Sequence, residues 1–578
     1  MKHLLLPALA VVALSCRTTP PATVKDVMDG FVTRLYKDYT PAQLDTLQYP
    51  LALLSKEEKE VLATQYLTFE TNVPVVVSLM RDAAQKTGPF WLAESGFRKT
   101  GLTVRNEEYT YEVWQKQFPA GKIGLGINGF DKHRPVYFLS VAPEKKSDKL
   151  VISQVFPESQ TLAVMKKGAF TYHDWDDLVL TEVPADLEGQ VLFQTIRGRA
   201  REAHVVGAFR TSPAPSGKVP DQLLLTWSGN PKTTMDIQWR TSPDVEKSEV
   251  QYWAGRDTLS APASAFRMED RLLRNDRYIN RFTASLKGLA PGTTYGYRVG
   301  SGATGWSPVS SFQTEKAEAA PFSYIWFGDT HKSAQWGEMA RKSLERHPDV
   351  SFFNIAGDLV STGLHRDEWD EFFRVSNPIF RSKPLMPIPG NHDSQDGLGA
   401  WMYEEMFSLP KNGPANQPAE RTYAYTYQNA LFLMIDATLP LESQTAWIRG
   451  QLKNTKATWK FVYFHFPPYN YEEDYSHIRK EWCTVFDEYG VDMVMGGHVH
   501  YYMRTKPMKA EKPDPKGTIY LISVGIPSEH PNMKAEDYAV VRDPKGYVYQ
   551  HVSIDGNKLR FRCFDKEGML KDELVLVK

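Results

Sequence analysis

Apolar residues recur with three different spacings in successive parts of the chain, and each spacing predicts a different kind of domain. Over residues 24–86 the pattern is helical, and Ser55-Lys56-Glu57-Glu58 reads as a capping box at the start of a helix. Short alternating runs, typical of strands, follow up to about residue 210; they include residues 109–113 and 149–152. We therefore predict a mixed α+β N-terminal domain over residues 24–210. No chemical motif in it indicates what it does.

A second pattern begins after residues 211–217, whose proline, serine and glycine content is typical of a linker. Strand-like runs then recur at short, regular intervals: residues 222–227, 235–241, 248–253, 281–286 and 295–300. This spacing predicts a β-sandwich over residues 218–315. The stretch that ends at Tyr295 resembles the turn and tyrosine corner of fibronectin type III domains, in which the tyrosine hydroxyl binds nearby backbone.

The third pattern, from residue 321 onward, alternates short apolar runs with amphipathic segments. The runs are residues 322–327, 350–355, 384–388, 430–435, 460–464 and 491–495. Near-continuous apolar runs of this length indicate buried strands. Residues 336–346 and 477–489 are amphipathic and predict helices. The sequence thus predicts an α/β domain over residues 321–578.

The first sixteen residues have the features of an export signal. Met1-Lys2-His3 is followed by an apolar run over residues 4–14, which is too short to span a bilayer. Ala13-Leu14-Ser15-Cys16 resembles a bacterial lipobox, in which the cysteine becomes the acylated first residue. We expect an exported, lipid-anchored protein of the bacterial cell envelope, with residues 17–23 as its tether. The alternative is an ordinary cleaved signal peptide and a secreted protein.

Composition narrows the function classes. A chain of 578 residues is too long for one hydrophobic core, so several domains are expected. The formal net charge is −1, whereas a nucleic-acid-binding protein usually carries an excess of basic residues, so the charge argues against this class. It also gives no reason to expect membrane contact other than a lipid anchor on Cys16. Three cysteines exclude a disulfide-stapled scaffold, and we expect Cys483 and Cys563 to be small buried hydrophobic residues.

Metal-ligand side chains follow five of the predicted strands of the third domain. Carboxyl ends of parallel strands meet at one edge of a sheet, where open α/β folds bind their ligands. The side chains placed there are Asp329, His331, Asp358, Asn391, His465, His498 and His500. All offer oxygen or nitrogen and none is a thiol, which suits manganese, iron or zinc. The sequence therefore predicts a site for two metal ions.

This arrangement resembles the calcineurin-like metallophosphoesterases and, among them, the purple acid phosphatases. The closer resemblance rests on the preceding sandwich, on His465-Phe466-Pro467-Pro468-Tyr469-Asn470, and on Gly497-His498-Val499-His500 with the residues to Arg504. A closing hairpin over residues 547–564 adds to it, so the resemblance covers about residues 218–578. It implies a four-layer αββα fold, a pair of iron, manganese or zinc ions, and a small phosphorylated substrate.

The resemblance also implies a role for each residue. The first metal would take Asp329, His331, Asp358 and His500, and the second Asp358, Asn391, His465 and His498. A hydroxide held by the metals would attack phosphorus. His392 would protonate the leaving alkoxide, with Asp393 orienting its imidazole, although Asp393 could instead cap the following helix.

Weaker expectations concern the surroundings of the site. We expect substrate contacts from three residues of this region. His477 would contact the phosphate or only begin a helix. The substrate site would also be lined by Tyr469 and Asn470, unless these two only pack their loop. Arg504 is expected to be a structural partner. His365 and His530 are possible neighbours of the pocket, and Trp326, Trp401 and Trp482 are expected in the core.

Two positions depart from the purple acid phosphatase pattern. His331 stands where that family has glycine, and Ser361 stands where it has a tyrosine metal ligand. The tyrosinate that colours those enzymes and favours ferric iron is therefore absent. We expect a colourless enzyme.

Three functions are consistent with these features. The first is hydrolysis of phosphate monoesters. The second is a phosphodiesterase that acts on nucleotides or lipid headgroups, since the same ligand set serves both reactions. The third is a surface binding protein that keeps a vestigial metal site, which the complete ligand set argues against.

Overall fold

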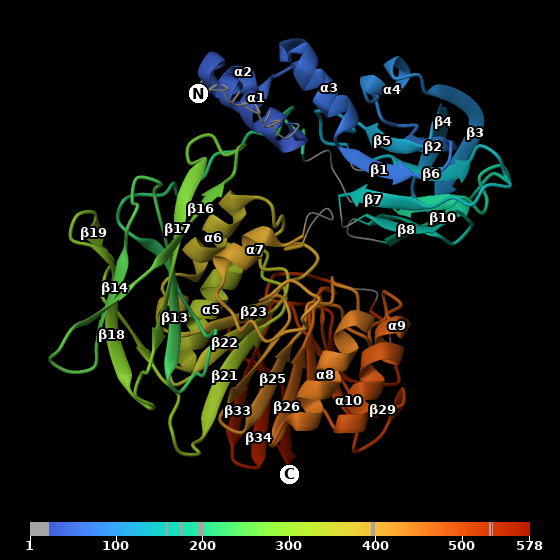
Figure 1. Cartoon of the computed structure of the whole chain (residues 1–578). Helices are drawn as coiled ribbons and strands as arrows, with labels where there is room; N and C mark the ends of the chain where they lie inside the picture. The colour runs from blue at the N-terminus through green and yellow to red at the C-terminus, as the bar shows by residue number, and fades with distance from the viewer. Residues whose placement is uncertain are drawn as a thin grey trace, which may run out of the picture.

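The computed structural model describes residues 22–133, 135–157, 160–173, 177–194, 202–394, 399–530, 533–534 and 536–578. The predicted signal segment and Cys16 lie outside these residues. Figure 1 shows three parts: an N-terminal domain, a β-sandwich beside the third domain, and an α/β domain with two sheets. Among the described residues, none of the helices combines the length and the apolar character that a membrane crossing requires.

The N-terminal domain begins with a helical segment and continues as β-structure. Its helices are α1 (Val24–Asp38), α2 (Pro41–Asp45), η1 (Pro50–Leu53), α3 (Lys56–Thr64) and α4 (Trp91–Glu94). Thr23, Thr40 and Ser55 each form a capping box. The strands are β1 (Leu67–Thr71), β2 (Val75–Asp82), β3 (Arg98–Asn106), β4 (Thr110–Phe118), β5 (Gly121–Leu125), β6 (Phe138–Pro143), β7 (Ile152–Phe156), β8 (Thr161–Val164), β9 (Phe170–His173), β10 (Asp177–Glu182) and β11 (Val191–Gln194).

The predicted helical stretch of residues 24–86 is wrong at its end, because β1 and β2 lie within it. The β-branched run Val75-Val76-Val77 favours a strand. β2 pairs with both β4 and β6, which places it inside a sheet of order β8-β11-β6-β2-β4-β3-β10-β9. A second sheet has the order β5-β1-β7.

Residues 221–313 form two antiparallel sheets around a shared core. Their strands are β12 (Asp221–Thr226), β13 (Thr234–Thr241), β14 (Glu249–Trp253), β15 (Leu259–Pro262), β16 (Ser264–Glu269), β17 (Tyr278–Lys287), β18 (Thr294–Ser301), β19 (Gly305–Trp306) and β20 (Ser310–Gln313). One sheet has the order β12-β13-β17-β16, and the other β15-β14-β18-β19 with β20 also on β18. The Tyr295 hydroxyl accepts a hydrogen bond from the Ala290 amide at 2.9 Å, as expected for a tyrosine corner.

The α/β domain contains two larger sheets, and all six strands predicted for it are present. The first sheet contains β21 (Phe322–Phe327), β22 (Phe352–Ala356), β23 (Leu385–Ile388), β33 (Val548–Asp555), β34 (Lys558–Asp565) and β35 (Leu570–Val577). The second contains β24 (Tyr423–Tyr427), β25 (Ala430–Met434), β26 (Trp459–Tyr463), β27 (Met493–Gly496), β28 (Tyr502–Thr505), β31 (Ile519–Ile522) and β32 (Ala539–Asp543). β29 (Met508–Lys509) and β30 (Lys512–Pro513) form a small separate pair.

Aromatic side chains fill the space between the two sheets. The ring of Tyr324 on β21 lies 5.3 Å from that of Phe432 on β25, and Trp326 lies 5.9 Å from Tyr463 on β26. The helices are α5 (Ala334–Arg346), α6 (Arg366–Ser376), η2 (Ile379–Arg381), α7 (Trp401–Met406), α8 (Glu442–Asn454), α9 (Ser476–Ile478), η3 (Arg479–Cys483) and α10 (Thr484–Tyr489). Figure 1 shows α8 and α10 on the side of the second sheet that faces away from the first.

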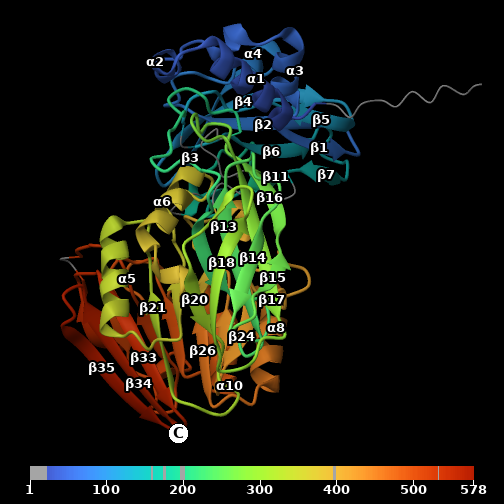
Figure 2. The same ribbon diagram turned by 90° about the vertical axis from the view of Figure 1, so that its left-hand side faces the viewer.

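Arginine contacts hold the three parts together. Arg271 and Arg277, between β16 and β17, bind Asp29 and Thr33 of α1 at 3.1 and 2.8 Å. A buried ion cluster joins the sandwich to α6, where Arg240 lies 2.8 Å and Arg366 2.9 Å from Asp370. Figures 1 and 2 both show the N-terminal domain beyond the end of the α/β domain at which α6 and α7 lie.

Candidate metal centre

The seven predicted ligands come from five loops that each follow a strand. Asp329 and His331 follow β21, Asp358 follows β22, Asn391 follows β23, His465 follows β26, and His498 and His500 follow β27. β21, β22 and β23 are parallel to one another, and so are β26 and β27. The structure brings all seven side chains together at the carboxyl ends of these strands, as open α/β sheets arrange their ligand sites.

One group of ligand atoms forms around Asp329. Its Oδ2 atom lies 3.1 Å from His500 Nε2 and 3.7 Å from His331 Nε2. The three residues offer atoms that all lie within 4.8 Å of one another, so they could hold one metal ion. Asp329 Oδ1 accepts a hydrogen bond from the His498 amide at 2.7 Å, which connects the first ligand loop to the last.

A second group forms around Asp358. Its Oδ2 atom lies 3.2 Å from His465 Nε2, and the atoms offered by Asp358, His465 and His498 lie within 4.8 Å of one another. Asn391 joins this group, because its Oδ1 atom lies 3.1 Å from His498 Nδ1. The same Asp358 oxygen lies 3.8 Å from His331 Nε2. Asp358 therefore faces both groups, as a carboxylate shared by two cations would.

The backbone is strained at three of the seven ligands. His331, Asp358 and His498 have φ angles of 43°, 51° and 71°, in the left-handed region that side chains other than glycine seldom adopt. Each such residue costs on the order of 1–3 kcal/mol and persists only where the surrounding structure enforces it. This concentration of strain at one place points to a functional site.

Two glycines give the carboxylates the room they need. A Cβ atom at Gly390 would lie 2.2 Å from Asp358 Oδ1, and one at Gly497 would lie 2.2 Å from Asp329 Oδ1. Any other residue at either position would displace a ligand.

The charge balance of the site fits a bound cation. Asp329 and Asp358 are buried, yet neighbouring histidines hold their pKa values below the ordinary range against the cost of burial. Burial alone would lower the pKa of His465, but the charges of Asp358 and Asp329 raise it to about 10. His465 Nδ1 lies 2.8 Å from the Ala356 carbonyl, and its buried Nε2 makes no well-formed hydrogen bond with any described residue, although Asp358 Oδ2 lies 3.2 Å away. The donor set and this orphaned nitrogen fit a metal ion.

His392 lies at the rim of both groups. Its Nδ1 atom is 2.8 Å from the Ser361 carbonyl, which fixes the ring so that Nε2 lies 4.0 Å from Asp358 Oδ2. Burial lowers the pKa of His392 to about 4, so the ring is neutral at pH 7 and Nδ1 carries the proton. His331, Asp358 and His392 also offer three atoms within 4.8 Å of one another.

Asp393 does not orient His392, which corrects the sequence prediction. Its carboxylate accepts three backbone hydrogen bonds, from Gly390 at 2.9 Å and from Leu359 and Val360 at 3.1 Å. It thereby connects the loop that carries Asn391 to the loop that carries Asp358. Burial and the charge of Asp358 raise its pKa to about 7.

Two of the three predicted substrate contacts are used to build their own loop instead. Tyr469 is buried against Tyr520 and Tyr538, at ring distances of 4.6 and 5.5 Å. The Asn470 side chain bonds to the backbone of Pro467, Glu472 and Glu473, which leaves it no role at the substrate. His477 is exposed and belongs to none of the ligand groups, and its ring lies 5.9 Å from Tyr475.

Glu473 is a site residue that the sequence analysis missed. Its Oε1 atom lies 2.9 Å from His498 Nε2, and its other oxygen accepts a hydrogen bond from the Tyr475 hydroxyl. A carboxylate on the outer nitrogen of a metal-binding histidine fixes the tautomer of the ring. Glu473 stands in a polar run, Tyr471-Glu472-Glu473-Asp474, and nothing in the sequence separates it from its acidic neighbours.

Family comparisons agree with this geometry. Residues 220–314 match the family described as "Purple acid Phosphatase, N-terminal domain", and residues 322–502 match "Calcineurin-like phosphoesterase". The second match contains all seven ligands. The chain therefore carries a calcineurin-like phosphoesterase domain, and with the preceding domain it resembles the purple acid phosphatases.

Similar proteins extend the comparison. An uncharacterized protein of Mycobacterium tuberculosis is 25% identical over 334 residues, which cover 50% of this chain and 62% of that protein. Acid phosphatase type 7 of Mus musculus is 27% identical over 420 residues, or 62% of this chain and 91% of the mouse protein. The purple acid phosphatase PPD1 of yellow lupin shares the fold, with a TM-score of 0.54, 15% identity and coverage of 89% and 93%. The chain thus spans about three fifths of the mycobacterial protein.

Other residues singled out in the sequence take structural positions around the phosphoesterase site. Arg504 makes a buried bidentate ion pair with Asp572, at 2.6 and 2.9 Å. His365 and His530 pair with Glu368 and Glu472 at 3.7 and 3.0 Å. The remaining residues are in or against the core: Trp326, Trp401, Trp482, Cys483 and Cys563.

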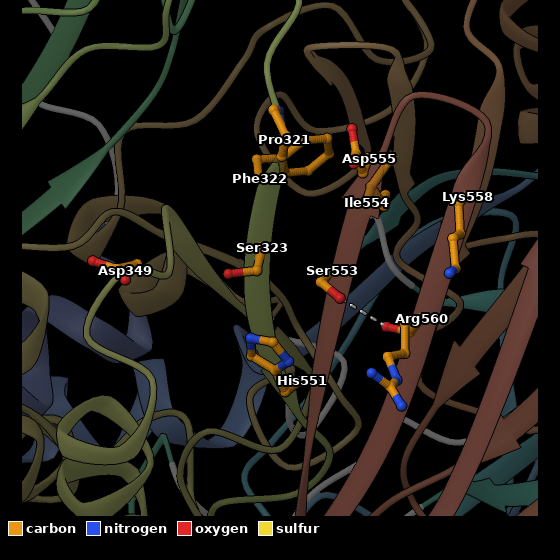
Figure 3. A pocket seen from close by; sticks show the side chains of 10 residues that line it. All are labelled: Pro321, Phe322, Ser323, Asp349, His551, Ser553, Ile554, Asp555, Lys558 and Arg560. Atoms are coloured by element: carbon orange, nitrogen blue, oxygen red, sulfur yellow. Dashed lines mark hydrogen bonds between the residues drawn. The ribbon is translucent and has the colours of Figure 1, made fainter.

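A hollow of about 360 Å³ in the same domain lies far from the metal ligands. Figure 3 shows it at the start of β21, beside Phe322, whereas the ligands follow the other end of that strand. Its charges are mixed, since Asp349 and Asp555 line it together with Lys558 and Arg560. Arg560 is moreover paired with Glu573 at 2.7 Å. This hollow is not part of the metal centre.

Proposed function

We propose that this chain hydrolyses phosphate monoesters at a centre of two metal ions. The observation that carries the proposal is the position of Asp358, which faces two groups of ligand atoms at once. The similarity of the chain to purple acid phosphatases supports phosphoester hydrolysis as the reaction class. A similar mouse protein is named acid phosphatase, which supports a phosphate monoester as the substrate.

Each metal would be held by four of the seven side chains. Asp329, His331, Asp358 and His500 would hold the first, and Asp358, Asn391, His465 and His498 the second. We propose iron, manganese or zinc, because all donors are oxygen or nitrogen. When bound, the two ions supply a water that ionises near neutral pH and positive charge beside the phosphoryl oxygens.

The chain's own residues would position and protonate the substrate. His392 presents Nε2 toward the site, and we propose that it protonates the leaving oxygen. Its ring is neutral in the free enzyme, so the proton would be taken up when the negatively charged phosphate binds beside it. His477, exposed on the short helix α9 that follows the His465 loop, would contact the outer part of the substrate.

Two finer descriptions belong to the same proposal. The phosphoesterase domain would be a four-layer αββα sandwich and residues 218–315 a fibronectin-type sandwich, supported by the paired sheets and the Tyr295 corner.

The protein would be exported and anchored through an acylated Cys16. Labelling cells with a radioactive fatty acid should mark the wild-type protein and not the Cys16→Ser variant; equal labelling would refute the anchor.

Substrate preference gives the direct test of the reaction. Protein reconstituted with manganese, iron or zinc should hydrolyse p-nitrophenyl phosphate with a higher kcat/KM than bis-p-nitrophenyl phosphate. A strong preference for the diester would replace the monoesterase by a phosphodiesterase. No turnover with any metal, together with no bound metal on elemental analysis, would leave a binding protein with a vestigial site.

A further inference from the structure

The outer face of the sandwich carries a tryptophan that lies flat on the sheet. Trp253 ends β14 and stands opposite Gly296 of β18. A Cβ atom at Gly296 would lie only 2.5 Å from the Trp253 ring, so glycine is required for the ring to rest there. Val250, Tyr297 and Val299 of the same strands point into the core, which leaves Trp253 on the outward face.

Two shallow hollows of about 340 and 380 Å³ share Trp253 in their lining. The first lies beside β14 and is lined by Gln251, Gly255, Arg256, Thr258 and Arg298. The second lies over β20 and reaches the phosphoesterase domain at Pro378, Arg381 and Ser382. Trp253 and Val309 line both hollows, and Val309 is 60% exposed.

Among the described residues, the charged side chains that line the two hollows are all basic, and the nearest acid on this face of β14 is Glu249, which accepts a hydrogen bond from Gln251 at 3.4 Å. Arg256, Arg298 and Arg381 line them, and no aspartate or glutamate does. Over the part of the chain that the structure describes, none of these three arginines forms an ion pair with a carboxylate. Arg298 binds the Gln251 amide oxygen at 2.7 Å and stacks 4.4 Å from the ring of Trp306, which extends the flat surface along β18. Arg256 and Arg381 are therefore available to an anion, whereas Arg298 lines the first hollow with its guanidinium held by Gln251.

We propose that this face of the sandwich binds an anionic polysaccharide. Both hollows include the Trp253 ring, so a ligand that fills both must contact this ring and carry negative charge in each hollow. A chain of sugar rings with repeated carboxylates has that form, since a sugar ring can lie on tryptophan while its acid groups meet the arginines. A single small anion would use only one hollow.

The proposed site is separate from the metal centre. Pro378 and Arg381 precede β23, whereas Asn391 follows that strand, so the hollows lie at the opposite edge of the sheet from the metal ligands. The sheet that carries Trp253 forms the left side of the molecule in Figure 1 and faces the viewer in Figure 2. Ligand could therefore bind there while the metal site remains open.

Binding of polygalacturonate to the full-length protein tests the proposal by affinity electrophoresis and calorimetry, with dextran as the uncharged counterpart. Arg256→Glu should weaken polygalacturonate binding about tenfold or more, because a charge-assisted bond is replaced by repulsion. Trp253→Ala should weaken it about 2- to 10-fold. Arg256 is exposed, so its replacement leaves the fold intact.

The matched control is Arg267→Glu, because Arg267 also stacks on an aromatic ring, that of Tyr278, but on the other sheet of the sandwich. It should bind polygalacturonate as the wild type does. All three variants should keep wild-type hydrolysis of p-nitrophenyl phosphate, so a failed phosphatase assay and a failed binding assay are distinguishable. The proposal would be overturned if the protein did not bind polygalacturonate, or if it bound dextran equally well. It would also be overturned if Arg267→Glu lost as much polygalacturonate affinity as Arg256→Glu, or if poly(dT) or poly-glutamate bound more tightly than polygalacturonate.

Discussion

Glu473 Oε1 lies 2.9 Å from His498 Nε2, so the outer nitrogen of a metal-ligand histidine is held by a carboxylate from another loop. The inner nitrogen, Nδ1, lies 3.1 Å from Asn391 Oδ1 and faces the second metal site. The hydrogen bond to Glu473 places the ring proton on Nε2 and leaves the Nδ1 lone pair for a cation. A residue of the loop 464–475 thus orients a candidate ligand in the loop 497–501.

Glu473→Ala should therefore weaken binding of the second metal about 10- to 100-fold, as loss of such outer partners does. Glu473→Gln, which can still accept the Nε2 proton through its amide oxygen, should restore most of the affinity. Titration of apo-protein with zinc, followed by calorimetry, measures both. The matched control is Glu472→Ala, whose side chain pairs with His530 instead. If Glu473→Ala and Glu472→Ala lost affinity equally, the effect would belong to the loop and not to the tautomer of His498.

Asp358→Asn should remove most bound metal and nearly all activity. The substitution keeps the size of the side chain but removes the negative charge that faces both ligand groups. Elemental analysis after dialysis should show the loss of both ions, whereas His500→Ala should mainly lower the occupancy of the first site. Wild-type turnover in Asp358→Asn would refute the bridging role.

His392→Ala should distinguish proton donation from metal binding. A lost general acid costs about 10²–10⁴-fold on substrates with poor alkoxide leaving groups and much less on p-nitrophenyl phosphate. Comparison of kcat/KM for the two kinds of monoester measures this difference. Equal losses on both, together with reduced metal content, would make His392 a ligand of the group that it forms with His331 and Asp358.

Iron-loaded protein should lack a strong visible tyrosinate band. Ser361 occupies the position at which purple acid phosphatases have a tyrosine ligand, and its amide and carbonyl bind Glu368 and His392. An absorption spectrum of the iron form checks this expectation. A purple preparation would mean that another tyrosine reaches the metal.

The cluster of candidate metal ligands was predictable from the sequence because each of these residues stands in a local motif. Gly357-Asp358 and Gly390-Asn391 follow short apolar strands, and the alignment of parallel strands then brings them to one edge. The role of Asp393 was not predictable, because its three backbone partners are fixed by how two loops pack. Glu473 was missed for the same reason: its contact with His498 depends on the loop of residues 464–475, whose course the sequence does not specify.

The helical reading of residues 24–86 failed for a different physical reason. The segment that includes Val75-Val76-Val77 lies in β2, between β4 and β6, and is almost entirely buried. A strand buried on both faces has no polar alternation, so periodicity alone does not separate it from a buried helix. The pairing of this segment with β4 and β6, and not its local sequence pattern, makes it a strand.

A stacked pair of histidines, of which His551 is buried and His347 half-buried, should make the phosphoesterase domain less stable in mild acid. The rings of His347 and His551 stack 4.2 Å apart, and Arg562 Nη2 lies 3.1 Å from His551 Nδ1. Burial, Arg562 and Arg346 lower the pKa of His347 to about 4, and burial, His347 and Arg562 lower that of His551 to about 3. In the unfolded chain both titrate near 6.5, so between about pH 6.5 and 4 the unfolded state binds more protons than the folded state.

The free energy of unfolding should therefore fall as the pH drops through this window, and His551→Gln should show a shallower fall than wild type. Denaturant unfolding of metal-free protein at several pH values measures the slope, with His477→Gln as the exposed-histidine control. Parallel slopes for wild type and His551→Gln would show that the pair does not set the acid sensitivity.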